Sequence, residues 1–157
     1  MQDDLDTKRA VELLNHIMEM ELAGVVRYTH YSLMVYGYSR IPIVEWLRGE
    51  ATESLAHANE AGEMVTTLGE HPSLAIGPLL ETHNHDIGAI LRESYEHEKE
   101  ALEVYGELLA VAVEGGSVLI EEYARKMISL ERAHLGEVDK MLRAPGDVGS
   151  TTPIPIV

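Results

Sequence analysis

Glu131-Arg132-Ala133-His134, in the last long helical stretch of the sequence, is the segment that decides the fold. Its acid and its imidazole are three residues apart, a spacing that on a helix places both side chains on one face, about one turn apart. Alone the motif is weak evidence, because a chain with 27 acidic residues and 8 histidines contains Glu-x-x-His by chance. Its weight comes from a second copy of its surroundings earlier in the chain.

The sequence repeats itself with an offset of 77 residues. His134 follows His57 by 77, and the Glu-x6-Tyr segment Glu98–Tyr105 follows the segment Glu21–Tyr28 by the same number. The repeat is clearest at residues able to bind metal. Each half of the chain is therefore interpreted as one helical hairpin, written twice.

Composition and charge restrict the classes of function. A chain of 157 residues is long enough to bury a full core, and its formal net charge of −15 argues against binding nucleic acid or an anionic membrane and suits cation capture. No apolar run approaches the ~20 residues needed to cross a bilayer. The acidic start, Met1 to Arg9, is unlike a secretory signal, and the absence of cysteine excludes disulfides and thiolate-held zinc or iron–sulfur centres. These features favour a cytoplasmic location.

Apolar residues recur at helical spacing in four stretches. The first begins at a cap formed by Asp4 or Asp6 and the third at Thr82 or Asn84. The first expected helix runs to about Tyr36, and the second runs from about Ile43 to Leu68. The third runs to about Glu114, and the fourth runs from Ser117 to near Arg143.

Proline and glycine mark the connections between these stretches. The segment Gly37–Pro42 is the first turn, with Pro42 suited to opening the second helix, and Gly69 is a plausible C-terminal cap. Gly115-Gly116 separates the last two helices.

The connection from Glu70 to Thr82 has no clear period and is too long for a tight turn between antiparallel neighbours. A short loop, a long crossover and a short loop predict an all-α four-helix bundle with the crossover between helices two and three. Residues 1–144 form this bundle domain, and residues 145–157, with three prolines, are expected to be an extended or disordered tail.

A Glu from each of two helices plus Glu-x-x-His from the other two is the ligand pattern of di-iron carboxylate bundles. On this pattern the sequence resembles bacterioferritin and, more loosely, the rubrerythrins, both in the ferritin-like superfamily, over about residues 5–143. The resemblance implies a ferritin-like four-helix bundle with a two-metal site at its centre. It implies metal ligands at Glu21, His57, Glu98, Glu131 and His134, with Tyr28 and Tyr105 as groups that hydrogen-bond ligands or pass electrons.

The sequence departs from this pattern at one ligand. The second-helix Glu should stand three residues before His57, where this chain has Ser54. Glu53, four before His57, projects on nearly the same face and is the first candidate to replace it; Glu50, two turns away on that face, is the second. With neither, each ion would keep one Glu, one His and a share of Glu131.

Two further departures concern haem and assembly. Leu55 stands where the resemblance predicts a haem-binding methionine, so no haem is expected. The segment Ser150–Val157 cannot form the short channel-lining helix of bacterioferritin, which argues against a 24-subunit storage shell. A homo-oligomer, a dimer at least, is expected.

The resemblance implies an oxidoreductase of the ferroxidase type that binds two iron ions, with manganese or zinc as alternatives, and oxidises Fe(II) with O2 or peroxide. Two alternatives stay open: a rubrerythrin-like peroxidase or oxidase without iron storage, and a non-catalytic metal-binding bundle whose site is altered at Ser54. His83, His85 and Asp86 are interpreted as a solvated helix terminus in preference to a surface metal site. His30 is interpreted as a core histidine with a local partner.

Overall fold

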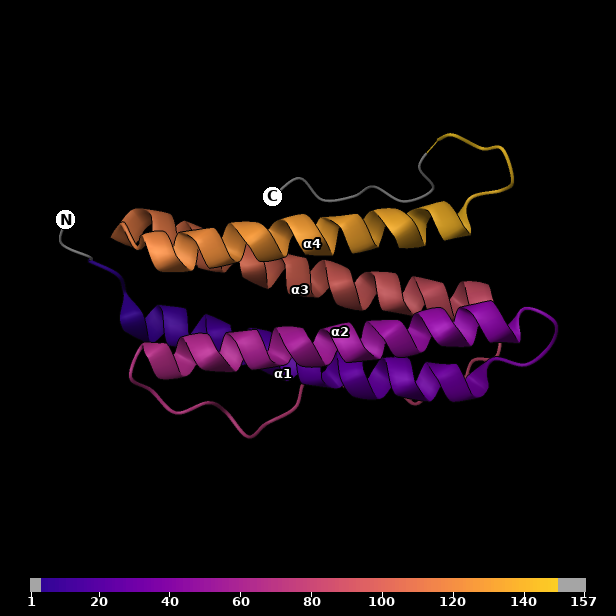
Figure 1. Ribbon diagram of the computed structural model, residues 1–157, viewed down its shortest axis with the longest axis horizontal. Helices are drawn as coiled ribbons and strands as arrows, with labels where there is room; N and C mark the ends of the chain where they lie inside the picture. The colour runs from indigo at the N-terminus through magenta and orange to yellow at the C-terminus, as the bar shows by residue number, and fades with distance from the viewer. Residues whose placement is uncertain (1–3, 150–157) are drawn as a thin grey trace. The chain divides into compact units, whose positions relative to one another are not determined.

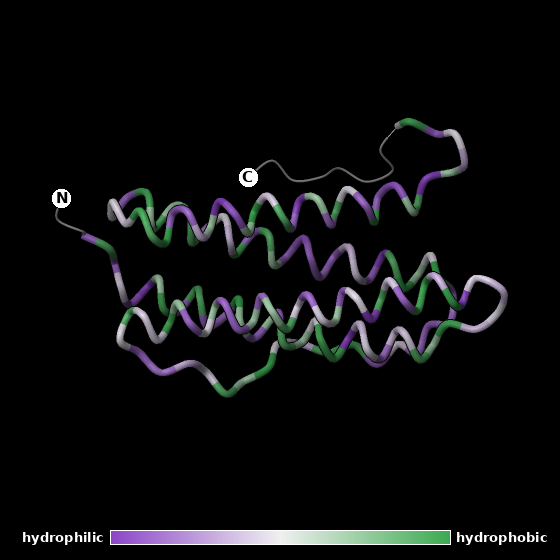
Figure 2. The backbone as a smooth tube through the Cα atoms, viewed as in Figure 1, coloured by the Kyte–Doolittle hydropathy of each residue, from purple (hydrophilic) through white to green (hydrophobic). Residues whose placement is uncertain are grey.

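The computed structural model describes residues 4–149. The regular secondary structure of these residues is entirely helical, without a strand, as predicted (Figure 1). Hydrophobic and hydrophilic residues alternate along every helix, as amphipathic packing requires (Figure 2). No helix within these residues is both long enough and apolar enough to cross a membrane. The four helices are α1 (Thr7–Met34), α2 (Arg40–Thr67), α3 (Ile87–Gly115) and α4 (Val118–Leu142).

The described chain forms two compact units, each of them one helical hairpin. The first unit, Thr7–Ile90, holds α1, α2 and the crossover. The second holds the residues from Leu91 onward, with α3 and α4, together with the short segment before Thr7. The boundary near residue 90 agrees with the 77-residue repeat, which also divides the sequence into two hairpins.

The helices α1 and α2 pack antiparallel along their length (Figure 1). Near their connection the rings of Tyr28 and Trp46 meet edge to face, with centroids 6.4 Å apart. Towards the other end, the Sδ atom of Met18 lies where a side chain on Gly62 would need space, 3.2 Å from a Cβ placed there. The buried cluster between these helices consists of Tyr28, Tyr31, Val35, Val44, Leu47, Ala51 and Ile90.

The turn between α1 and α2 is shorter than expected, because α2 begins at Arg40. The proline of the turn, Pro42, therefore lies within the first helical turn, where its missing N–H removes no intrahelical bond. Gly37 takes a φ of +96° in the connection, and the Arg40 guanidinium donates a hydrogen bond to the carbonyl of Val35 at 2.7 Å. This bond satisfies a carbonyl just after the end of α1.

The end of α2 is stabilised by Gly69, as predicted. Gly69 has a φ of +82°, its N–H donates to the carbonyl of Thr66, and the N–H of Glu70 donates to that of Val65. These two bonds form a Schellman motif, which requires the left-handed conformation that glycine adopts without strain.

The crossover runs along α1, as the fold prediction requires. Gly77 marks the closest approach, because a Cβ there would lie 3.0 Å from the carbonyl oxygen of Glu19, too close for any larger residue without a backbone shift. Three contacts fasten the crossover in order along the helix: Ser73 N to Asn15 Oδ1 at 2.8 Å, Gly77 N to Glu19 O at 2.9 Å, and His85 Nδ1 to Met34 O at 2.8 Å.

The start of α3 differs from the expectation. Neither Thr82 nor Asn84 begins it; the first helical residue is Ile87. The carboxylate of Asp86 accepts a hydrogen bond from the N–H of Ala89 at 2.8 Å, the arrangement of an N-cap. Asp86 therefore caps the N-terminus of α3, in agreement with its interpretation as part of a helix terminus.

The helices α3 and α4 also pack antiparallel. The rings of Tyr105 and Tyr123 lie near the connection with centroids 6.3 Å apart. Gly116, with a φ of +70°, ends α3 through a second Schellman motif, in which the N–H of Ser117 donates to the carbonyl of Ala112 at 3.0 Å. Ser117 is also the residue before α4, so the connection consists of Gly116 and Ser117 alone.

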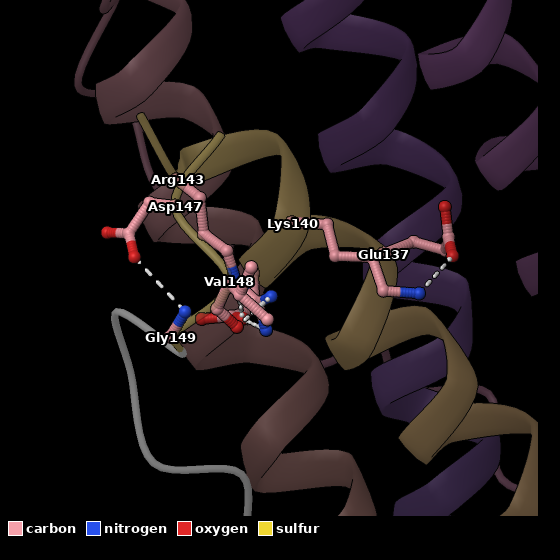
Figure 3. Close-up of polar contacts among 7 residues, drawn as sticks. Glu137, Lys140, Arg143, Asp147, Val148 and Gly149 are labelled. Atoms are coloured by element: carbon pink, nitrogen blue, oxygen red, sulfur yellow. Dashed lines mark hydrogen bonds and ion pairs between the residues drawn. The ribbon is translucent and has the colours of Figure 1, made fainter. Parts of the chain in front are cut away.

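The segment after α4 folds back on the helix end. Figure 3 shows the side chain of Arg143 within this turn, where its Nη1 atom donates to the carbonyl of Val148 at 2.8 Å. The N–H of Asp147 donates to the carbonyl of Ala144 at 2.9 Å. The remainder of the predicted tail, residues 150–157, lies outside the described residues.

Candidate metal centre

The first hairpin places a buried carboxylate against a buried imidazole. Glu21 projects from α1 and His57 from α2, and the Oε1 atom of Glu21 lies 3.6 Å from the Nδ1 atom of His57. Only 3% of Glu21 and 6% of His57 are exposed. An ionised carboxylate at such depth is costly unless it is paired, hydrogen-bonded or bound to a cation. The amphipathic pattern of α1 places Glu21 in an otherwise apolar stripe, which makes the acid conspicuous.

A second carboxylate meets the other edge of the same ring. The Oε1 atom of Glu53 lies 3.7 Å from the Nε2 atom of His57, and the Glu53 side chain is 38% exposed. A carboxylate oxygen of Glu50 lies within 4.8 Å of one on Glu53. Ser54, where the resemblance expects a ligand, is buried and offers only a hydroxyl.

The second hairpin gathers two acids and a histidine. Glu98 comes from α3, and Glu131 and His134 come from α4; one possible ligand atom from each lies within 4.8 Å of the others. The Oε2 atom of Glu131 is 4.0 Å from the Nδ1 atom of His134. Both acids are buried, Glu131 to 1% exposure, whereas His134 is half-buried.

The two hairpins are similar but not chemically equal. With the offset of 77, Ser54 of the first hairpin corresponds to Glu131 of the second. The first hairpin keeps an acid near its histidine through Glu53, but this acid is half-exposed, whereas Glu131 is buried. A cation held by the first hairpin would therefore meet one buried carboxylate, and one held by the second would meet two.

The two tyrosines of the Glu-x6-Tyr segments are core residues. Tyr28 is buried and packs edge to face against Tyr31 at 6.4 Å as well as against Trp46, and Tyr105 is fully buried beside Tyr123. These contacts account for the burial of both rings. A redox role for either phenol stays a prediction.

One buried polar group was not anticipated from the sequence. Asp139 in α4 is fully buried, and its Oδ2 atom accepts hydrogen bonds from Nη2 and Nε of Arg143 at 2.7 and 2.9 Å. Burial raises the pKa of Tyr95 above its usual value, and the carboxylates of Asp139 and Glu96 raise it further. The Asp-x3-Arg spacing could have predicted this ion pair from the sequence, because it places both side chains on one helical face.

Other titratable residues take different positions. His97, adjacent to Glu98 in the sequence, is buried, yet it belongs to none of the ligand groups found within residues 4–149. His30 is half-buried, and its ring meets that of His83 edge to face with centroids 5.5 Å apart. His30 was expected to have a local partner, but its Nε2 atom is buried without a hydrogen-bond partner among residues 4–149.

A four-helix fold with a long crossover and a carboxylate–histidine cluster in each hairpin defines a helical bundle with a candidate metal centre. The chain belongs to the ferritin-like family, since the family model for the ferritin-like domain matches residues 11–145. The predicted ferritin-like four-helix bundle is thereby confirmed.

Several relatives are similar to this chain. The bacterioferritin of Desulfovibrio desulfuricans is 26% identical over 129 residues, which cover 81% of this chain and 70% of the relative. The X-ray structure of a bacterioferritin from that organism, solved with its diiron site in different catalytic states, has a TM-score of 0.75 at 25% identity and covers 87% of this chain and 79% of its own.

A ferritin-like diiron-carboxylate protein from Bacillus anthracis str. Ames has a TM-score of 0.82 at 23% identity, over 91% of this chain and all of its own. The bacterioferritin of Rhodobacter capsulatus has a TM-score of 0.77 at 19% identity, over 86% of this chain and 84% of its own. At these identities the two structures establish the fold alone.

Proposed function

We propose that this chain binds iron and oxidises Fe(II) with O2 or peroxide as the oxidant. The observation that carries the proposal is the burial, in each hairpin, of an acid from one helix beside a histidine from the next. We assign the iron ligands to Glu21, His57, Glu98, Glu131 and His134.

The chemistry of these donors fits iron. Carboxylate oxygens with imidazole nitrogens suit Fe or Mn, and a chain without cysteine offers no thiolate ligand that would select other metals. Two Fe(II) ions supply one electron each, which together reduce O2 to hydrogen peroxide with the uptake of two protons. The protein residues neutralise the cations with buried negative charge, orient them and keep water away from them.

The geometry favours a positioning role for Glu53 over the ligand role expected from the sequence. Glu21 and Glu53 lie beside different ring nitrogens of His57, and a ring nitrogen either binds an ion or carries a proton. With Nδ1 bound to an ion shared with Glu21, Nε2 would carry the proton and donate it in a hydrogen bond to the Glu53 carboxylate. Such a carboxylate fixes the tautomer and orientation of a metal-binding histidine.

The alteration at Ser54 favours one alternative function, a metal-binding bundle without turnover. Within the first hairpin only one buried carboxylate accompanies His57, so an ion held by that hairpin alone would be bound more weakly than one held by Glu98, Glu131 and His134. A chain that binds one ion firmly and the other weakly would take up metal without efficient two-electron chemistry. A rubrerythrin-like peroxidase remains the alternative among enzymes.

Anaerobic titration with Fe(II), followed by exposure to O2, tests the proposal. We expect two iron ions per chain and an absorbance increase from Fe(III) when O2 is added. Glu98→Gln should lose both signals, and Glu100→Gln, an exposed position two residues away on α3, should keep them. Uptake of zinc without oxidation of iron or turnover of peroxide would leave the non-catalytic alternative.

We further propose that the protein is a cytoplasmic homo-oligomer. Several large apolar side chains in the first unit are exposed, and burial against a second copy would cover them. Sizing chromatography distinguishes a dimer from a 24-subunit shell. The exposed residues include Leu33, Tyr36, Tyr38, Ile41 and Leu74.

A further inference from the structure

A cavity of about 150 Å³ lies in the first unit between α1 and the crossover. It shares no residue with the carboxylate–histidine clusters. Contacts on both sides hold its walls: Gly77 bonds to Glu19 before it, and His85 lies 2.8 Å from the carbonyl of Met34 after it. The lining residues are Val26, Arg27, His30, Leu79, Leu80, Glu81 and His83.

Two imidazoles in this cavity have unusual surroundings. The Nε2 atom of His30 is buried and has no hydrogen-bond partner among residues 4–149. His83 has a φ of +51°, the one positive value at a non-glycine residue in the described chain. Side chains with a Cβ avoid that region, and strain of this kind concentrates at functional sites. The strained backbone places the ring of His83 edge-on to that of His30.

The buried arginine in the cavity wall favours an anion over a metal ion. Arg27 is buried, its Nη2 atom donates to the hydroxyl of Tyr31 at 3.3 Å, and a guanidinium offers five N–H donors and no acceptor. A fixed positive charge opposes a metal ion between the two imidazoles. Consistent with this, no group of three possible ligand atoms within 4.8 Å in the described chain includes His30 or His83.

Glu81 restricts which anion fits. A carboxylate accepts hydrogen bonds and donates none, so it repels an anion that carries no proton. Inorganic phosphate keeps at least one proton at neutral pH, whereas sulfate and simple carboxylates keep none, and a phosphate monoester loses its last proton with a pKa of about 6. The wall therefore combines donors for phosphate oxygens with an acceptor for a phosphate hydroxyl.

We propose that this cavity binds inorganic phosphate. Arg27 and the imidazoles of His30 and His83 donate to its oxygens, and Glu81 accepts from its hydroxyl. The volume suits one phosphate with a few waters, at ~30 Å³ of liquid volume for each water. The proposal is independent of iron binding, because none of these residues belongs to the proposed iron site.

Calorimetric titration of the full chain at constant ionic strength and pH 7.5 tests the proposal. Inorganic phosphate should bind saturably at one site per chain, and sulfate, acetate and methyl phosphate should bind at least tenfold more weakly. Equal binding of sulfate would overturn the role of Glu81 and the proposal with it. Tighter binding of methyl phosphate would assign the cavity to phosphate esters and likewise overturn it. The Glu98→Gln variant should bind phosphate as the parent does, which separates this site from iron-bound phosphate.

Two variants locate the binding. His83→Gly keeps the left-handed backbone and removes the ring, so phosphate affinity should fall at least tenfold while the unfolding temperature stays equal or rises. Arg27→Gln should weaken binding at least tenfold, and Arg9→Gln, an exposed arginine on the same helix, should not change it. Unchanged affinity in His83→Gly, or equal losses in both arginine variants, would overturn the site. Binding of Zn2+ in place of phosphate would do so as well.

Discussion

The Nδ1 atom of His57 lies 3.6 Å from the Oε1 atom of Glu21, although the two residues belong to different helices. On the opposite edge of the same ring, Nε2 lies 3.7 Å from Glu53. One imidazole thus stands between a buried carboxylate and a half-exposed one. We propose that the two acids have different tasks, and the difference is measurable.

Glu53→Gln should lower Fe(II) affinity by about 10–100-fold, the usual effect of losing a carboxylate that orients a metal-binding histidine. Glu21→Gln should lower it further, because it removes a proposed ligand. Anaerobic Fe(II) titration measures both, with the exposed Glu45→Gln on α2 as the control. A larger loss in Glu53→Gln than in Glu21→Gln would make Glu53 the ligand.

His134→Ala should weaken metal binding more than His83→Ala. His134 has a ligand atom within 4.8 Å of two buried acids, whereas His83 lies in the phosphate cavity beside Arg27. Elemental analysis after dialysis against Fe(II) or Zn2+ compares the two variants. If they lose metal equally, the metal site has been misplaced.

The buried hydroxyl of Tyr95 makes stability depend on pH at the alkaline end. Its pKa in the folded chain is above the ordinary value of 10.0, so above pH 10 the unfolded chain binds fewer protons than the folded one. The contribution of Tyr95 is therefore complete below pH 10 and is lost as pH rises through the folded pKa. Urea denaturation between pH 9 and 11 should show a smaller decline for Tyr95→Phe than for the parent.

Tyr38→Phe provides the matched control for that experiment, since Tyr38 is fully exposed. Its alkaline decline should equal that of the parent. The same slope in Tyr95→Phe and Tyr38→Phe would mean that burial of Tyr95 has no influence on alkaline unfolding.

Gly77→Ala should destabilise the fold by about 1–3 kcal/mol, the usual cost of overpacking. The added methyl would lie 3.0 Å from the carbonyl oxygen of Glu19 and 3.2 Å from the Cα of Met20, both backbone atoms that cannot easily move. Gly49→Ala, in the middle of α2 with nothing within 4 Å, should instead stabilise by about 0.5–1 kcal/mol. Thermal or urea unfolding measures both, and stabilisation by Gly77→Ala would contradict the close approach of the crossover.

The sequence was sufficient to predict the helices and the crossover, because periodicity and the 77-residue repeat are carried by many residues at once. Helix starts were harder. Thr82, Asn84 and Asp86 are all good N-caps, and only the tertiary position of the chain selects Asp86. The second helix was expected to start at about Ile43, just after Pro42, but it starts at Arg40. The expectation was late because proline is tolerated throughout the first helical turn and does not mark its first residue.

Some contacts between distant residues could not be predicted from the sequence. Asp139 lies near Tyr95 only because α3 and α4 pack antiparallel, and no local pattern marks that pair. The left-handed backbone of His83 could not be predicted either, because positive φ is uncommon at any non-glycine residue, even at histidine, where it is enriched. The acid and histidine positions were predictable because their types and spacing were unusual in an apolar stripe.

The fastening of the crossover along α1 has a practical consequence for anyone cutting or extending this chain. A long stretch without regular structure would ordinarily invite proteases and tolerate insertions, but here backbone groups at Ser73 and Gly77 are engaged by α1. A protease can cleave the crossover only after this segment has detached from α1. The short turn between α1 and α2, where Tyr38 is fully exposed, is the better place to open the chain or attach a label.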